Sequence, residues 1–316
     1  MRLCRFERDG EEYAGFYFDN KLVPVGAAVD ACEQHTHKRH ELPQGSSLVS
    51  MLACGEHHDA AAAVGDWLSK NLDGVDALDV SKVRLLAPFP TPRKLFLLAG
   101  NYAAHIEEGG GHAVERARTF PYVFMKPIST INHPNAPVPI PSVSPDHIDW
   151  EAELAVVIGK AAKHVSEADA LNYVAGYTVI NDVSDREYTP NPGREKRPKD
   201  EFFDWLHGKW HDGFCPMGPC VTSAEAIGDP QSLQITLKVN GETKQDASTA
   251  LQIYPVAGVI EFISRSITLE PGDIISTGTP SGVGAASGTY LHPGDEVEVS
   301  IDKIGVLKNH MVAEQA

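Results

Sequence analysis

The sequence predicts an α+β, β-rich fold in which a small N-terminal domain precedes a larger mixed β domain. Three observations support this fold class: short aliphatic runs dominate after Lys94, helical segments are few and short, and a stretch with three prolines follows Val80. We place the domains at residues 1–80 and 94–316, joined by a linker at residues 81–93. A chain of 316 residues, 42% of them hydrophobic, can bury one large core or two moderate ones.

The composition limits which partners and which cellular compartment we expect. A formal net charge of −16 makes nucleic acid and anionic membranes poor partners, but does not exclude a small anion drawn to a local metal. The sequence has neither a signal-peptide pattern nor an apolar run long enough to cross a bilayer, so we expect a cytoplasmic protein. Its five cysteines form no C-x-x-C pair, which argues against a disulfide framework or a zinc ribbon.

The N-terminal domain begins with a predicted hairpin. Strands are expected at residues 2–7 and 13–18, joined by the turn signal Asp9-Gly10, and a helix at residues 60–72. The histidines near residue 37 (His35, His37 and His40) lie in a polar stretch without acidic or cysteine partners at fixed spacing. We interpret them as solvated loop residues rather than metal ligands.

The first candidate for catalysis follows a strand predicted at residues 94–100. A helix over residues 101–108 would place His105 and Glu108 on one face, as a base with an orienting carboxylate. The same spacing also fits a surface histidine beside a glutamate. Three glycines follow at 109–111, so we expect this helix to be a lid that becomes ordered around substrate.

The strand predicted at residues 148–158 carries two carboxylates inside an aliphatic run. Alternation puts Glu151 and Glu153 on one face, and a second strand at 176–180 leads directly to Asp182. Three carboxylates without a nearby Cys or His suit Mg²⁺ or Mn²⁺ first and Ca²⁺ second. The open alternative is a solvated edge strand for the two glutamates and a simple turn at Asp182.

Further elements are expected around this strand. Lys126, at the end of a strand expected at residues 122–126, would face either the site or solvent, and residues 190–208 would form a loop over the site mouth. The remaining elements are a capped helix from Ser166, a hairpin turning at Asn240-Gly241, a helix at 254–264 and strands at 274–276 and 296–301.

Several spaced segments in a fixed order indicate a family more specifically than any one of them alone. HIDWEAELAVVIGK, NDVSDRE, GKWHDGFCPMGP and STGTPSGVG, in this order, resemble the signature segments of the fumarylacetoacetate hydrolase family over residues 93–311. NYAAHIEE resembles the lid motif of its acylpyruvase-like and 2-hydroxyhepta-2,4-diene-1,7-dioate isomerase-like branch. Classical fumarylacetoacetases have a further carboxylate ligand a few residues before this histidine. Position 98 is Leu98 here, which favours the three-ligand branch.

The resemblance implies roles for individual residues. Metal ligands would be Glu151, Glu153 and Asp182, and catalytic residues His105, Glu108 and Lys209, the last binding the substrate's oxygen anion. Arg186, Gly278 and Thr279 would bind substrate, Arg186 with bracing of the metal site as its alternative role. The resemblance also implies a rolled β-sheet and a homodimer.

The chemistry expected from this set is cleavage of a C–C bond in a 3-acylpyruvate or other 2,4-dioxo acid. A divalent metal would stabilise the pyruvate enolate that leaves. Two alternatives remain open: an isomerase or decarboxylase of 2-hydroxymuconate-type or oxaloacetate-like acids on the same site, and a non-catalytic protein that binds a 2-oxo acid.

Overall fold

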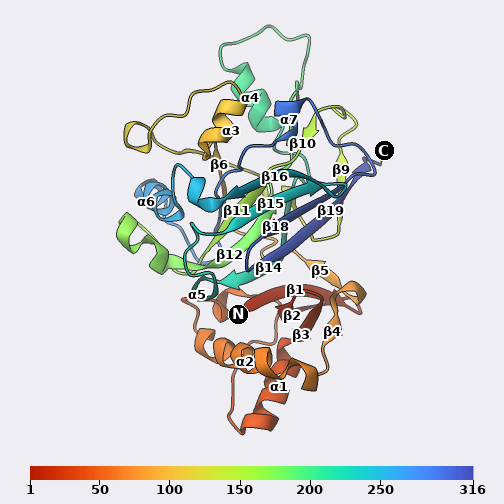
Figure 1. Cartoon of the computed structure of the whole chain (residues 1–316), viewed down its shortest axis with the longest axis vertical. Coiled ribbons are helices and arrows are strands. Elements are labelled where there is room, and N and C mark those ends of the chain that lie inside the picture. Colours follow the sequence, from red (N-terminus) through yellow and green to blue (C-terminus); the bar gives the residue numbers. More distant parts are fainter. Residues whose placement is uncertain (316) are drawn as a thin grey trace.

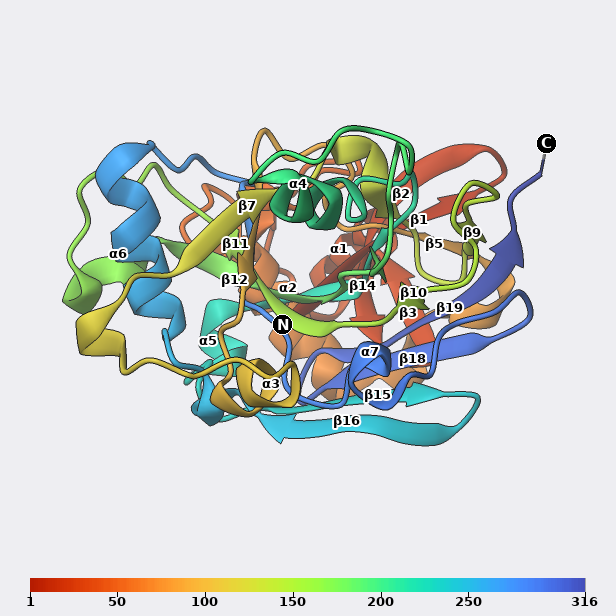
Figure 2. The same cartoon turned by 90° about the horizontal axis from the view of Figure 1, so that it is seen from above.

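The computed structural model describes residues 1–315 and arranges the chain in three levels (Figure 1). At one end lie the helices α1 (Val25–Thr36) and α2 (His58–Asn71). The sheets occupy the middle. At the opposite end lie α3 (Ala103–Glu108), α4 (Asp200–His207) and the one-turn helix α7 (Gly284–Ser287). Seen from above, α3 and α7 lie together on one side and α4 on the other (Figure 2).

Within residues 1–315, the largest sheet has 12 strands. Its main path is β4-β3-β2-β1-β14-β12-β11-β17-β6-β7, with β5 paired to β1 and β8 to β14. Its strands are β1 (Arg2–Arg8), β2 (Glu11–Phe18), β3 (Lys21–Pro24), β4 (Leu78–Asp79), β5 (Arg84–Leu86), β6 (Leu95–Ala99), β7 (Tyr122–Met125), β8 (Ile131–Asn132), β11 (Ala152–Ile158), β12 (Val174–Asn181), β14 (Cys215–Ser223) and β17 (Ile274–Ser276).

A second sheet of five strands packs against the first, again counting only the described part of the chain. Its order is β16-β15-β18-β19-β9, formed by β9 (Pro137–Ile140), β15 (Gln234–Val239), β16 (Glu242–Ser248), β18 (Glu296–Ile301) and β19 (Gly305–Ala313). A small ladder pairs β10 (Ile148–Asp149) with β13 (Ser184–Asp185). The remaining helices are α5 (Ala224–Ile227), α6 (Val256–Ser266) and 3₁₀ turns at Val49–Met51, Leu72–Gly74, Val80–Lys82, Arg116–Arg118, Ile128–Thr130, Glu167–Tyr173 and Thr249–Leu251.

The predicted α+β, β-rich fold is confirmed, and two elements differ in detail. The strand expected at 148–158 is interrupted, because side chains replace the ladder there: Asp149 accepts from Trp150 N at 2.7 Å, and Asn181 from Glu151 N at 3.0 Å. The segment after Ser166 is a 3₁₀ helix, which Ser166 does cap. Strands β3, β9, β14 and β19 were not predicted, nor were the short strands β4, β5, β8 and β13. The domain division near residue 80 remains a prediction, since strands from both sides of it belong to one sheet.

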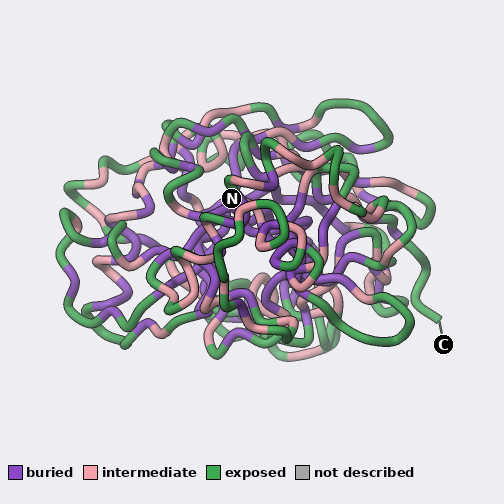
Figure 3. Tube along the Cα trace, turned by 90° about the horizontal axis from the view of Figure 1, so that it is seen from below, coloured by how far each residue is buried: buried purple, intermediate pink, exposed green. Residues whose placement is uncertain are grey.

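The core lies on both faces of β11, as the alternation predicts. Leu154 and Val156 belong to the hydrophobic cluster that includes the five-stranded sheet, whereas Ala155 and Val157 pack with residues of the N-terminal segment. Buried residues lie mainly in the interior, and exposed loops surround them (Figure 3). Among the described residues, none of the helices combines the length and the apolar character that a membrane span requires.

Candidate metal and active site

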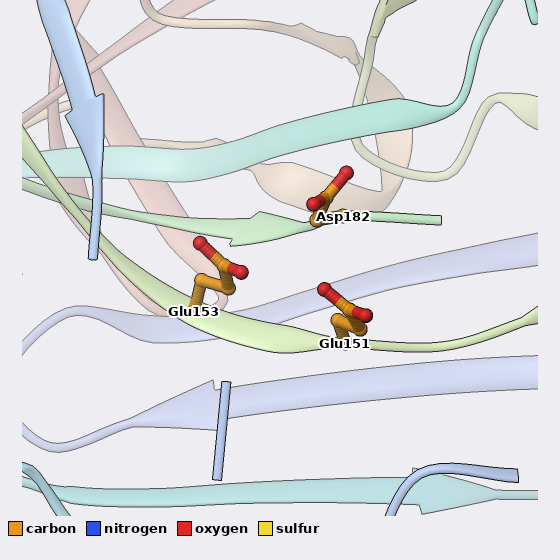
Figure 4. A group of neighbouring side chains, drawn as sticks. All are labelled: Glu151, Glu153 and Asp182. Carbon is orange, nitrogen blue, oxygen red and sulfur yellow. The ribbon is translucent and has the colours of Figure 1, made fainter. Parts of the chain in front are cut away.

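Three carboxylates converge where β11 begins and β12 ends. The antiparallel register pairs Glu153 with Ile180, and Asp182 N donates to the carbonyl of Glu151 at 2.9 Å, which brings Asp182 beside the two glutamates. One carboxylate oxygen from each of Glu151, Glu153 and Asp182 lies within 4.8 Å of the others, and all three residues are buried. Figure 4 shows the three side chains pointing toward one another from the two neighbouring strands.

Two lysines compensate part of this negative charge. Lys209 Nζ lies 2.9 Å from Glu151 Oε2 and 2.7 Å from Asp182 Oδ2, and Lys126 Nζ lies 2.6 Å from Asp182 Oδ1. Burial alone would lower the pKa of Lys209, but Asp182 and Glu151 outweigh it and raise the pKa. Lys209 therefore remains charged, and Asp182 is held from two sides by the two lysines.

Of the three clustered carboxylates, Glu153 is the one that has no ion pair with any residue in the described part of the chain. Its Oε2 accepts from Ser276 Oγ and from Gly278 N at 3.0 Å, while its buried Oε1 has no hydrogen-bond partner. Burial, together with the negative charges of Asp182 and Glu151, raises the pKa of Glu153 well above its ordinary value. An orphaned carboxylate oxygen in an all-oxygen donor set fits a hard divalent cation held by Glu151, Glu153 and Asp182.

Arg186 completes the charged lining. Its Nε donates to Asp149 Oδ2 at 2.7 Å, and its terminal nitrogen lies 2.8 Å from Glu151 Oε1. Asp149 also accepts from Gly284 N at 2.6 Å and Ala285 N at 3.0 Å, so it joins the start of α7 to the arginine. For Glu151, the effect of burial is outweighed by Lys209 and Arg186, and its pKa falls below the ordinary range. Arg186 is thus part of the site rather than of a surface ion pair.

The predicted His–Glu pair forms on α3. His105 Nδ1 lies 2.8 Å from Glu108 Oε1, and Glu108 Oε2 accepts from Gly282 N at 2.8 Å. Both side chains are less than one fifth exposed. The second oxygen of Glu108 therefore ties the helix to the loop before α7, and Nε2 of His105 is left for a proton or a water molecule.

Lys209 is positioned by a glycine and an aromatic wall. A Cβ on Gly208 would lie 2.2 Å from the carbonyl oxygen of Asp185, so only glycine lets the end of α4 approach β13 this closely. The ammonium lies 5.5 Å from the ring centre of Phe124 and 5.7 Å from that of Trp205. The predicted loop at 190–208 thus contains α4 and supplies Trp205 to the site.

A cavity of about 170 Å³ brings most of these residues together. Its walls include His105, Glu151, Arg186, Lys209 and Thr279. The Thr279 hydroxyl accepts from Gln245 Nε2 at 2.8 Å and keeps its own proton free to donate. The N–H of Gly278 is engaged by Glu153, and a contact between Gly278 and substrate stays a prediction.

The sequence reasoning missed Asp149 as a site residue and left Lys126 undecided. Lys126 has its side chain fully buried and also donates to the carbonyls of Val183 and Phe214, at 3.1 and 2.7 Å. A signal existed for both: each is a charged residue at the end of an aliphatic strand, where burial requires a partner.

Two relatives are similar in sequence to this chain over most of its length. The rat protein "Oxaloacetate tautomerase Fahd2a, mitochondrial" (Rattus norvegicus) is 39% identical over 234 residues, which are 73% of this chain and 70% of the relative. The "2,4-didehydro-3-deoxy-L-rhamnonate hydrolase" of Sphingomonas sp. is 36% identical over 269 residues, 82% of this chain and 90% of the relative.

Solved structures of similar fold superpose on this chain over almost its full length. A fumarylacetoacetate hydrolase from Exiguobacterium antarcticum superposes with a TM-score of 0.77 at 32% identity, covering 99% of this chain and 100% of the other. Maleylpyruvate hydrolase from Sphingobium sp. SYK-6, in complex with manganese (II) ion and pyruvate, gives 0.72 at 27% identity, with 100% of both chains covered. The model of the fumarylacetoacetate (FAA) hydrolase C-terminal family matches residues 94–312, and the chain therefore belongs to the fumarylacetoacetate hydrolase family of enzymes.

Proposed function

We propose that the protein is a divalent-metal-dependent hydrolase that cleaves the C–C bond of a 3-acylpyruvate or related 2,4-dioxo acid. One observation carries the proposal: His105, bonded to Glu108, shares one cavity with Lys209, Arg186 and Glu151 of the three-carboxylate cluster. A base, two fixed cations and a metal-binding set are the components that hydrolysis through an enolate requires.

When bound, the divalent cation supplies a Lewis acid for the carboxylate and keto oxygens of the substrate and for the charge of the enolate. The protein's own groups do the rest. Glu108 holds the Nδ1–H of His105, whose Nε2 accepts a proton from water as the water oxygen bonds to the distal carbonyl carbon. The C–C bond then breaks, and its electron pair leaves with the pyruvate part as an enolate, which takes up at C3 the proton that His105 had accepted from water. Lys209 stabilises the negative charge that develops on oxygen.

Magnesium or manganese is the proposed ion, with calcium as a weaker substitute. Three carboxylates without nitrogen or sulfur donors suit any of these hard cations. The manganese and pyruvate bound to the maleylpyruvate hydrolase support both the ion and the kind of product.

Keto–enol tautomerisation of an oxaloacetate-like acid is the second candidate. It is favoured by the 39% identity to a protein named oxaloacetate tautomerase. This reaction needs proton transfer at C3 on the same chelated 2-oxo acid, and the His105–Glu108 pair is equipped for it without attack by water. Isomerisation of 2-hydroxymuconate-type acids and decarboxylation would use the same enolate.

Product analysis separates these reactions. The protein is incubated with Mg²⁺ or Mn²⁺ and, in turn, acetylpyruvate, enol oxaloacetate and a 2-hydroxymuconate-type diene. Hydrolysis predicts equal amounts of acetate and pyruvate from acetylpyruvate, no turnover after exhaustive chelation, and recovery when the ion is added back. Conversion of enol to keto oxaloacetate without C–C cleavage would replace the hydrolase with the tautomerase. Binding of oxalate with no turnover of any compound would leave a non-catalytic binding protein.

We further propose a cytoplasmic homodimer that takes a small 2-oxo acid and has neither nucleic acid nor membrane as a partner. The net charge of −16 supports the last two points, and the family resemblance supports the dimer. Sedimentation velocity of the full chain tests the dimer, and cell fractionation tests the compartment.

A further inference from the structure

An apolar groove adjoins the catalytic cavity. We use this name for the cavity of about 590 Å³ whose walls include Phe120, Tyr122, Phe124, Phe202, Trp205 and Phe262. Strand β7, the segment before it, and the helices α4 and α6 supply these side chains. The side chains of Phe120, Tyr122 and Phe202 are 58%, 64% and 54% exposed, so the rings lie open to solvent instead of filling a core.

The groove continues the catalytic cavity. Ala99 and Trp205 line both spaces, and Phe124 lies in T-shaped contact with Trp205, their ring centres 4.9 Å apart. Since Lys209 lies against the same two rings, the groove begins where the charged site ends. A substrate held at its 2-oxo acid end would direct its other end along these aromatic walls.

The side chains that line the groove are uncharged. Within residues 1–315, no lysine, arginine or histidine lines the groove. The adjacent stretch before α4 is basic, but none of residues 190–199 lines the groove, and Arg194 and Arg197 are paired with Asp200. A carboxylate placed in the groove would lose water without gaining a cation, whereas a methylene or phenyl group gains by leaving water.

We propose that the apolar groove binds the acyl part of the substrate and that this part is an uncharged aliphatic or aromatic chain. The inference rests on the proposed function, because it assigns the variable end of the same 2,4-dioxo acid. Its consequence is a preference for apolar acylpyruvates over those with a second carboxylate at the distal end.

A matched series of substrates tests the inference on the unaltered protein with Mn²⁺. The compounds are acetylpyruvate, pentanoylpyruvate and the pentanoyl analogue with a terminal carboxylate, each assayed by pyruvate release. We expect kcat/KM for pentanoylpyruvate to exceed that for acetylpyruvate by about tenfold or more, from burial of three methylenes, and the carboxylate to remove the gain. Equal values for all three, or a preference for the carboxylate, would overturn the acyl site and leave the hydrolase proposal intact. No pyruvate from any compound would overturn the proposed function and the acyl site with it.

Single substitutions locate the preference. Phe120→Arg places a cation in the groove and should lower the ratio of pentanoyl- to acetylpyruvate kcat/KM by about fivefold or more, while raising the relative rate of the terminal carboxylate. Phe120→Leu should keep the ratio within about twofold, because leucine stays apolar. The matched control is Phe203→Arg, because Phe203 lies on α4 but outside the groove lining and is 43% exposed. If Phe203→Arg shifts the ratio as much as Phe120→Arg, or if Phe120→Arg alters only the sedimentation coefficient, the groove is not the acyl site.

Discussion

Glu153 has the most unfavourable surroundings of the residues at the site. It is fully buried, and Asp182 and Glu151 add repulsion to the penalty of burial. Lys126 and Lys209 contact Asp182 and Glu151 instead. In the metal-free protein, the Glu153 charge therefore reduces stability, and a bound dication would reverse the sign of its contribution.

Glu153→Gln should separate these two effects. The amide carries no charge, so the metal-free variant should unfold with a free energy about 1 kcal/mol higher than the unaltered protein, while its affinity for Mn²⁺ should fall at least about tenfold. Thermal unfolding with and without Mn²⁺ measures both. Glu298→Gln, in the half-buried ion pair with Lys308, is the control and should change neither by much. A metal-free Glu153→Gln protein that melts lower than the original would contradict the repulsion argument.

His105→Ala tests the general base. If Nε2 of His105 takes the proton, kcat should fall about 10²-fold or more, with KM and the melting temperature little changed, because the ring is not part of a hydrophobic core cluster. The rate of pyruvate release at saturating substrate measures kcat. His310→Ala, on β19 with a side chain 50% exposed, serves as the control. An unchanged kcat would remove His105 from the mechanism.

At the scale of elements, a backbone hydrogen bond ties α3 to the loop before α7. Gly282 N donates to Glu108, and the same glycine crosses β16, where a Cβ would lie 2.1 Å from the carbonyl oxygen of Lys244. Its φ of +99° also lies in the region that favours glycine. The position of α3 thus depends on how closely this loop approaches the five-stranded sheet.

Gly282→Ala should displace the loop and, through Glu108, His105, the proposed general base. We expect kcat to fall about tenfold or more, since small misplacements of a catalytic group are costly. Gly288→Ala is matched in backbone conformation, with φ of +68°, but its Cβ would meet nothing within 4 Å. It should cost only about 1 kcal/mol of stability and leave kcat unchanged. Equal kcat values for the two variants would show that the tether does not position α3.

Local patterns predicted many of the elements, and distant hydrogen bonds explain the main difference. Asp9 and Gly10 adopt positive φ and join β1 to β2, as the turn signal indicates. The break at Trp150 and Glu151 was not predictable, because Glu151 N donates to Asn181, 30 residues away, and only the bond from Trp150 N to Asp149 is local. For the site, the sequence predicted the three clustered carboxylates and the His–Glu pair. The family resemblance added Lys209 and Arg186, whereas Lys126 was left undecided, because no local pattern encodes the approach of its strand to Asp182.

At the scale of the whole molecule, the N-terminal segment supports the strands that carry the carboxylates. Strand β1 pairs with β14, next to β12 in the large sheet, with Leu3 opposite Val221. Ala155, Val157 and Ile180 belong to the hydrophobic cluster formed with residues such as Phe16 and Val64. The side of β11 that bears Glu151 and Glu153 therefore continues into a core that the first eighty residues complete.

Deletion of residues 1–80 should therefore disrupt the metal site in the rest of the chain. Without that segment, β14 loses its pairing with β1, and the apolar side chains of β11 and β12 are exposed to water. We expect the fragment 81–316 to bind a hydrophobic dye, to aggregate and to show no saturable Mn²⁺ binding, while the full chain unfolds in urea in one transition by both tryptophan fluorescence and circular dichroism. Comparison at equal concentration, with the full chain as control, decides the outcome. A monomeric fragment with the Mn²⁺ affinity of the full chain would show instead that the two predicted domains fold independently, and that the shared sheet contributes little to the site.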